Sequence, residues 1–136
     1  MLIKTESRYP VNRGAIRKGI YEVLATEGLG NLDAQVSVFV CGSRKMKSLA
    51  DKHLGDNKVH EVLSFPFEDS KHGEAFVALP SETRMLGDII VSWPEVVRLA
   101  GENDRLVDDE LAFLVGHGME HLLGKHHEDE ELRTKK

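Results

Sequence analysis

The sequence of 136 residues has one cysteine, Cys41, and no apolar run near the roughly 20 residues that a membrane span needs. A single cysteine excludes an internal disulfide bond, so we expect a reducing, cytoplasmic location. The amino terminus carries Glu6 and no long apolar segment, and we therefore expect no signal peptide. Hydrophobic residues at 40% and charged residues at 30% are ordinary globular usage, which argues against a disordered or fibrous protein.

Positive charge is scarce in the second part of the chain. Residues 61–136 hold eight Lys/Arg against seventeen Asp/Glu, a net charge of −9, whereas residues 1–60 hold ten against six, a net charge of +4. Because the whole chain is acidic, composition alone does not argue for binding to nucleic acid. The basic first part is a candidate surface for it, beside the alternative that the asymmetry reflects two solvated faces.

The length fits a single domain, residues 1–136, and the chain shows no internal repeat. Apolar periodicity and turn residues give the expected elements in this order: strand 1–5, a helix from Pro10 to Gly28, strand 35–41, a helix from its N-cap Ser43 to Leu54, strand 61–67, a loop over 68–84, strand 86–92, a helix over 93–100 closed by Gly101, and a last helix from about Asp108 to Gly124. This alternation predicts an α+β fold with a small mixed β-sheet packed with helices.

The last predicted helix carries two histidines at helical spacing. His117 and His121 are four residues apart, so both imidazoles project from one face and can reach one ion. Gly124 can reverse the chain in a left-handed conformation and bring His127 back toward them. Three imidazoles with a fourth position left to water are typical of a catalytic zinc site.

The spacing matches the ligand and glycine positions of the metzincin pattern H-E-x-x-H-x-x-G-x-x-H, with one element missing. Gly118 stands where that pattern has its glutamate base, which argues against a peptidase. His126 adjoins His127 and is the alternative third ligand. Glu120 is the only carboxylate inside the motif; it either assists a proton transfer as a catalytic residue or is an ordinary exposed helix residue.

The segments HGMEHLLGKHH, Val62 to Pro66 (VLSFP) and Leu86 to Ile90 (LGDII) resemble, in this order, the YbeY family of bacterial metal-dependent endoribonucleases. The resemblance implies a zincin-like sandwich and one Zn²⁺ per chain, with other divalent metals possible. It implies His117, His121 and His127 as metal ligands. It also implies action on single-stranded RNA in 16S ribosomal RNA 3′-end maturation and ribosome quality control, with the small ribosomal subunit as partner.

The chain departs from the family's pattern where the substrate would bind. Leu54 stands where the family usually keeps an arginine thought to bind phosphate. Lys52, Lys58 or Arg44 could replace it, although each could equally be an ordinary exposed cation. Ser64 and Phe65 lie in the segment expected to wall the cleft, where Phe65 either stacks an unpaired base or belongs to the core.

Three functions are compatible with these residues. The first is a metal-dependent, single-strand-specific endoribonuclease, because phosphodiester cleavage can take its nucleophile from a metal-activated water and does not need a base at Gly118. The second is a catalytically weakened ribosome-assembly or RNA-binding factor, suggested by Leu54. The third is a metallohydrolase of another substrate. Neither the metal's identity nor the oligomeric state follows from the sequence.

Overall fold

The computed structural model describes residues 2–6, 8–30, 34–66 and 84–124. Its elements are β1 (Leu2–Thr5), α1 (Arg13–Thr26), β2 (Ala34–Cys41), α2 (Ser43–Leu54), β3 (Val62–Pro66), β4 (Arg84–Ser92), α3 (Trp93–Glu102) and α4 (Val107–Leu122). One sheet has the strand order β1-β2-β4-β3, in which β1, β2 and β4 are parallel and β3 is antiparallel to β4. The predicted α+β fold with a small mixed sheet is confirmed. The loop predicted over 68–84 lies outside the described residues, except that Arg84 begins β4.

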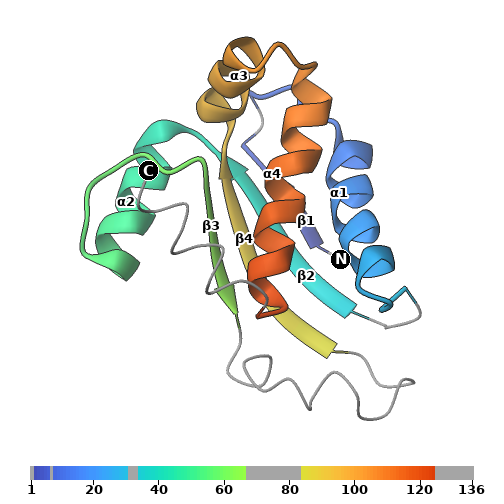
Figure 1. Cartoon of the computed structure of the whole chain (residues 1–136). Helices are drawn as coiled ribbons and strands as arrows, with labels where there is room; N and C mark the ends of the chain where they lie inside the picture. The colour runs from blue at the N-terminus through green and yellow to red at the C-terminus, as the bar shows by residue number, and fades with distance from the viewer. Residues whose placement is uncertain (1, 7, 31–33, 67–83, 125–136) are drawn as a thin grey trace.

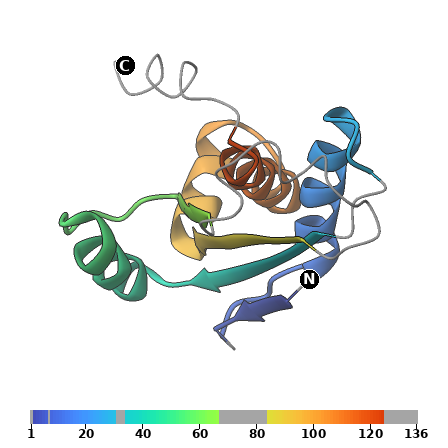
Figure 2. The same cartoon turned by 90° about the horizontal axis from the view of Figure 1, so that it is seen from below.

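The helices divide unequally between the two faces of the sheet. Helices α1 and α4 lie side by side over one face, with α3 near the start of α4, whereas α2 lies beyond β3 on the other side (Figures 1 and 2). The main core joins the sheet to α1, α3 and α4, and includes Val38 and Ile89. A second cluster joins Cys41 and Leu63 to the inner face of α2. Residues alternate between these two cores along each strand, as the pleat requires.

Two of the predicted helix starts are wrong. Helix α1 begins at Arg13 rather than near Pro10, because the side chain of Asn12 accepts a hydrogen bond from the amide of Gly14 at 2.9 Å. Ser43 does not cap α2. Gly42 occupies the N-cap, and its amide donates to the carboxylate of Glu6 at 2.7 Å. A carboxylate there favours the positive end of the helix dipole, and it comes from a residue 36 positions earlier in the chain.

Two of the predicted details at the carboxyl ends of helices also need correction. Leu54, expected on the apolar side of α2, is 51% exposed at the last residue of the helix. Gly101, expected to close α3, lies inside it, because the helix continues to Glu102. Gly124 follows α4 with a φ angle of 74°, so its predicted left-handed conformation is confirmed, and Gly28 after α1 has a similar φ angle of 73°.

Helix α4 begins at Val107, one residue before the predicted start. Asp108 and Asp109 lie in its first turn, where carboxylates favour the helix dipole, but the N-cap residue is Leu106, which makes no side-chain hydrogen bond to the helix. Asp108 instead accepts a hydrogen bond from the side chain of Asn12 at 2.8 Å, which ties the start of α4 to the start of α1. The predicted apolar side of α4 is confirmed by the burial of Leu111 and its neighbours.

Candidate metal centre

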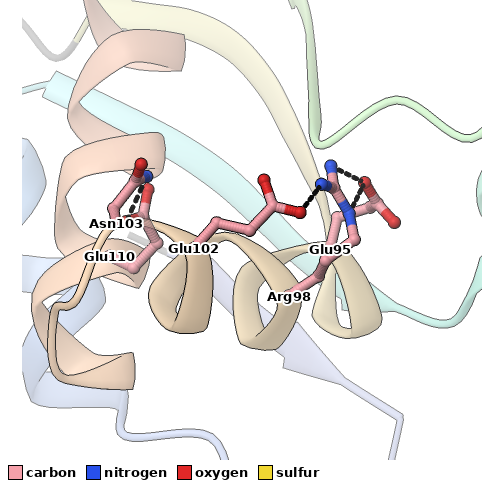
Figure 3. Close-up of polar contacts among 5 residues, drawn as sticks. All are labelled: Glu95, Arg98, Glu102, Asn103 and Glu110. Carbon is pink, nitrogen blue, oxygen red and sulfur yellow. Dashed lines mark hydrogen bonds and ion pairs between the residues drawn. The ribbon is translucent and has the colours of Figure 1, made fainter.

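A buried carboxylate anchors the beginning of α4, two turns before the first histidine. Glu110 is 1% exposed, and its Oε1 accepts a hydrogen bond from Nδ2 of Asn103 at 3.2 Å (Figure 3). Nη1 of Arg105 lies 3.8 Å from the same oxygen. Because a buried carboxylate requires polar partners, these contacts hold α4 against the end of α3. Figure 3 also shows the ion pairs along α3, in which Arg98 bonds both Glu95 and Glu102.

Glycines on either side of His117 define the directions around α4. A Cβ at Gly116 would approach Val23 of α1 at 3.3 Å, so this side of α4 faces α1. A Cβ at Gly118 would lie 2.9 Å from Cγ2 of Ile89, so that side faces the sheet. At about 100° per residue, His117 is turned about 100° from each of these sides, and His121 turns about 40° toward the sheet side. His117 therefore points between the α1 side and the sheet side of α4 and also lines the pocket toward α1, whereas His121 lies closer to the sheet side.

The buried position of Gly118 explains the missing base in physical terms. The Cβ of a glutamate there would lie 2.9 Å from Cγ2 of Ile89 and 3.3 Å from Cγ2 of Val62. The metzincin base could not enter this chain without displacing strand side chains, so any hydrolytic chemistry at the histidine pair has to proceed without it.

The two imidazoles face each other through their Nε2 atoms, which are 3.2 Å apart. Their ring centroids are 4.6 Å apart and the rings are inclined by 65°. Two ligand nitrogens at about 2.0–2.1 Å from a tetrahedral zinc ion would be roughly 3.3–3.4 Å apart. The spacing of the two nitrogens fits one shared ion; a hydrogen bond between two neutral tautomers would give the same distance.

Glu120 approaches His117 from the other side of its ring. Its Oε1 lies 3.9 Å from Nδ1 of His117. The side chain of Glu120 is 40% exposed and that of His117 is 23% exposed. A carboxylate at the second nitrogen of a metal-binding imidazole is the usual way of fixing that ring's tautomer and orientation. Glu120 is thus placed behind His117, away from the Nε2 pair.

The side chains of β3 alternate across the sheet, and this separates two of the predicted substrate-binding residues. Ser64 pairs with Ile89 and shares the face of Val62, which is the face covered by α4. Phe65 points to the opposite face, where it packs in the second cluster with its ring 4.9 Å from that of His53. Phe65 is therefore part of the core beneath α2, the alternative that the sequence left open, and lies on the face of the sheet opposite α4.

The predicted lysines belong to the α2 side of the molecule. Lys52 is exposed in the last turn of α2, and Lys58 is exposed between α2 and β3. Helices α2 and α4 lie on either side of β3 in both views (Figures 1 and 2). The exposed basic residues of α2 are Arg44, Lys45, Lys47 and Lys52, and two of them, Lys45 and Lys47, had not been singled out from the sequence.

One polar contact before β3 was also missed. Nε2 of His60 lies 3.1 Å from the Asp56 carboxylate, and the backbone amide of Lys58 donates to the same carboxylate at 3.1 Å. The Lys58 amide, followed by His60, lowers the pKa of Asp56 below its usual value. The signal in the sequence was the pairing of a carboxylate and an imidazole four residues apart. The contact fixes the backbone that leads from the basic helix into β3.

The predicted third ligand, His127, and its neighbour His126 lie outside the described residues. Within the residues that the structure describes, no three His, Cys, Asp or Glu side chains converge as a complete set of metal ligands. The structure therefore brings together two of the three predicted ligands.

The fold and these side chains define a small α+β protein with a candidate two-histidine metal-binding motif on the helix beside the antiparallel edge strand. The sequence profile of the family described as endoribonuclease YbeY matches residues 3–135. The chain belongs to the YbeY family of endoribonucleases.

Two relatives illustrate the extent of the match, and both are named endoribonuclease YbeY. The protein from Syntrophomonas wolfei is 37% identical over 102 residues, which are 75% of this chain and 65% of the relative. The protein from Moorella thermoacetica is 35% identical over 126 residues, which are 90% of this chain and 80% of the relative.

The solution structure of TM1509 from Thermotoga maritima is similar in fold. The TM-score is 0.58 at 24% sequence identity, and the match covers 93% of this chain and 74% of the other. In the part of the chain that the structure describes, none of the helices combines the length and apolarity needed to cross a bilayer.

Proposed function

We propose that this chain is a metal-dependent endoribonuclease that cleaves single-stranded RNA. The observation that carries the proposal is the pair of Nε2 atoms of the partly buried His117 and His121 on α4, 3.2 Å apart. Membership of the endoribonuclease family supports the choice of RNA as substrate. We further propose His127 as the third ligand and zinc as the metal, because three imidazoles with one open position suit a catalytic zinc ion.

The roles of the chain's own residues follow from their positions. His117 and His121 would hold the ion through Nε2, and Glu120, whose Oε1 lies 3.9 Å from Nδ1 of His117, would orient that ring. The bound ion would polarise a phosphoryl oxygen and provide a nucleophile from water near neutral pH. Gly118 contributes no base, so Glu120 acts as a positioning residue rather than as the primary proton acceptor.

The RNA path proposed here runs from the basic side of α2 across β3 to the histidines. Lys52 and Lys58 lie on the α2 side, where exposed cations attract phosphates. Ser64 lies on the histidine side of β3, where its hydroxyl can donate to a phosphate. A single strand suits this path because unpaired nucleotides can splay over a short edge strand, whereas a duplex is recognised across two grooves.

The biological setting is proposed from the family resemblance. We infer that the substrate is ribosomal RNA, with a role in 16S 3′-end maturation and ribosome quality control. The corresponding partner is the small ribosomal subunit and the location is the cytoplasm. The net charge of −5 is compatible with a nuclease that acts on a preassembled particle rather than binding free RNA tightly.

The test is cleavage of a fluorescently labelled single-stranded RNA by the zinc-loaded protein. We expect endonucleolytic products from the wild type and at least a hundredfold loss of rate in His117→Ala, because removing a ligand removes the ion. His53→Ala is the matched control, since His53 is an exposed histidine on α2; its rate should stay within about threefold of wild type. Equal cleavage by His117→Ala would refute the proposal and identify a contaminating nuclease.

Leu54 favours a second candidate, an RNA-binding ribosome-assembly factor with weakened chemistry. This half-exposed leucine occupies the position expected for a phosphate-binding arginine. The two candidates differ in a single observation. The assembly factor would bind small-subunit particles without turnover under any divalent metal, whereas the nuclease would release RNA fragments from them.

A further inference from the structure

A groove of about 450 Å³ lies between α1 and α4, on the side of α4 away from β3. It exists because the two helices touch through small residues. A Cβ at Gly19 would meet the backbone of Ala112, and Gly116 faces Val23 and the carbonyl of Gly19. Longer side chains on either side of this contact form the walls. These side chains include Lys18 and Glu22 of α1, and Asp109 and Phe113 of α4.

The charges of the walls are mostly of one sign. Among the lining residues that the structure describes are four with carboxylates, Glu22, Glu27, Asp109 and Glu120, and one with an ammonium group, Lys18. Such a surface repels phosphates, so it does not suit an RNA backbone. It is complementary to a ligand that carries positive charge.

An aromatic side chain adds an apolar contact to this acidic surface. Phe113 lines the groove and is 55% exposed, although a phenylalanine ring normally favours burial. The guanidinium of Arg105 lies 4.7 Å from the centroid of its ring and covers part of it. An exposed ring that is already restrained in this way can anchor an apolar side chain at little cost in conformational entropy.

We propose that the groove between α1 and α4 docks a lysine- or arginine-rich segment of a protein partner, with one apolar side chain of that segment seated on Phe113. The cations of the segment pair with the carboxylates of the walls, among them Glu22 and Asp109. The proposal goes beyond the nuclease activity and does not depend on it.

The placement of the groove assigns different sides of α4 to the two kinds of ligand. The proposed RNA path lies on the β3 side, toward the basic helix α2, whereas the groove lies on the α1 side (Figure 1). His117 and Glu120 also line the groove, and Oε1 of Glu120 lies 3.9 Å from Nδ1 of His117. A docked protein segment would therefore contact the metal centre from the α1 side, whereas the proposed RNA path reaches it from the β3 side.

The test uses fluorescence anisotropy with a labelled ten-residue peptide of alternating lysine and alanine that contains one central leucine. Its counterparts carry glutamate at every lysine, or alanine in place of the leucine. We expect the lysine peptide to bind the full chain at low salt and to weaken as salt is raised, and the glutamate peptide not to bind. The peptide without leucine should bind roughly tenfold more weakly.

Variants locate the binding to the groove. Phe113→Ala should weaken the lysine peptide about tenfold and Glu22→Gln about threefold, because the first removes an anchor and the second a rim charge. The control Asp51→Asn removes an exposed carboxylate from α2 and should change affinity by less than twofold. Both groove side chains are exposed enough for folded variants to be expected, which circular dichroism checks.

Three results would overturn the proposal. The first is equal binding of the lysine and glutamate peptides, and the second is unchanged affinity in both groove variants. The third is a different occupant: Phe113-dependent self-association in sedimentation would assign the groove to a second copy, and Phe113-dependent binding of a labelled single-stranded RNA, measured without peptide, would assign it to nucleic acid. Because binding is measured without turnover, the outcome is independent of whether the chain cleaves RNA.

Discussion

Replacing Gly118 with alanine should destabilise the protein by about 1 kcal/mol, although alanine is ordinarily the better helix residue. In a helix interior the exchange stabilises by roughly 0.5–1 kcal/mol. At position 118, however, the new methyl group would lie 2.9 Å from Cγ2 of Ile89 and 3.3 Å from Cγ2 of Val62. Ile89 is fully buried and β-branched, so it cannot easily move aside. Overpacking of this kind costs about 1–3 kcal/mol, which exceeds the gain in propensity.

The matched control is Gly101→Ala, which lies in α3 with no atom within 4 Å of the new methyl group. It should stabilise the protein by about 0.5–1 kcal/mol. Urea unfolding of both variants gives the comparison, and the melting temperature of Gly118→Ala should fall by roughly 3–5 °C. Equal stabilisation by the two alanines would refute the conclusion that position 118 faces the sheet, and with it the explanation for the absent base.

Three further predictions concern the α2 side of the molecule. Leu54→Arg should lower the KM for single-stranded RNA by about two- to fivefold in a steady-state assay. Its free energy of unfolding should change by less than about 0.5 kcal/mol, because the side chain of Leu54 is half exposed. An unchanged KM would exclude this position from the RNA path. Glu6→Gln should cost about 1 kcal/mol in thermal unfolding, because the charged hydrogen bond to the Gly42 amide at the start of α2 is weakened, and an unaltered melting curve would contradict that cap. Burial, followed by the nearby Glu6 carboxylate, raises the pKa of Cys41 from 9.0 to about 11, so alkylation of the folded protein should be slow at pH 8 and accelerate toward pH 11. Because the thiol ionises at a lower pH in the unfolded chain than in the folded one, the free energy of unfolding should fall between pH 9 and pH 11. Rapid alkylation of the folded protein at pH 8 would contradict the burial of the thiol.

The histidine pair could be predicted from the sequence because its geometry is local. His117 and His121 are separated by one helical turn, and any α-helix places residues four apart on the same side. The order of strands and helices followed from apolar periodicity for the same reason. What the sequence could not provide was the direction of the helix relative to the sheet, which depends on the contacts of Gly116 and Gly118 with distant elements.

The features that were missed depend on contacts between distant parts of the chain. Alternation along β3 separates Ser64 from Phe65, but only the position of α4 decides which of them faces the histidines. Glu6 displaces Ser43 from its expected role at the start of α2 because the fold brings β1 beside the end of β2. The groove between α1 and α4 likewise needs Gly19 and Ala112 to meet across the fold.

The most direct test of the metal centre is the zinc content of the purified protein by mass spectrometry, run on the wild type and on single alanine variants of His117, His121, His126 and His127. We expect one zinc ion per wild-type chain, loss of the ion in the variants of His117, His121 and His127, and retention in the His126 variant and in the His53→Ala control. A wild-type stoichiometry that persists in both His117→Ala and His121→Ala would show that the facing imidazoles on α4 do not hold the metal.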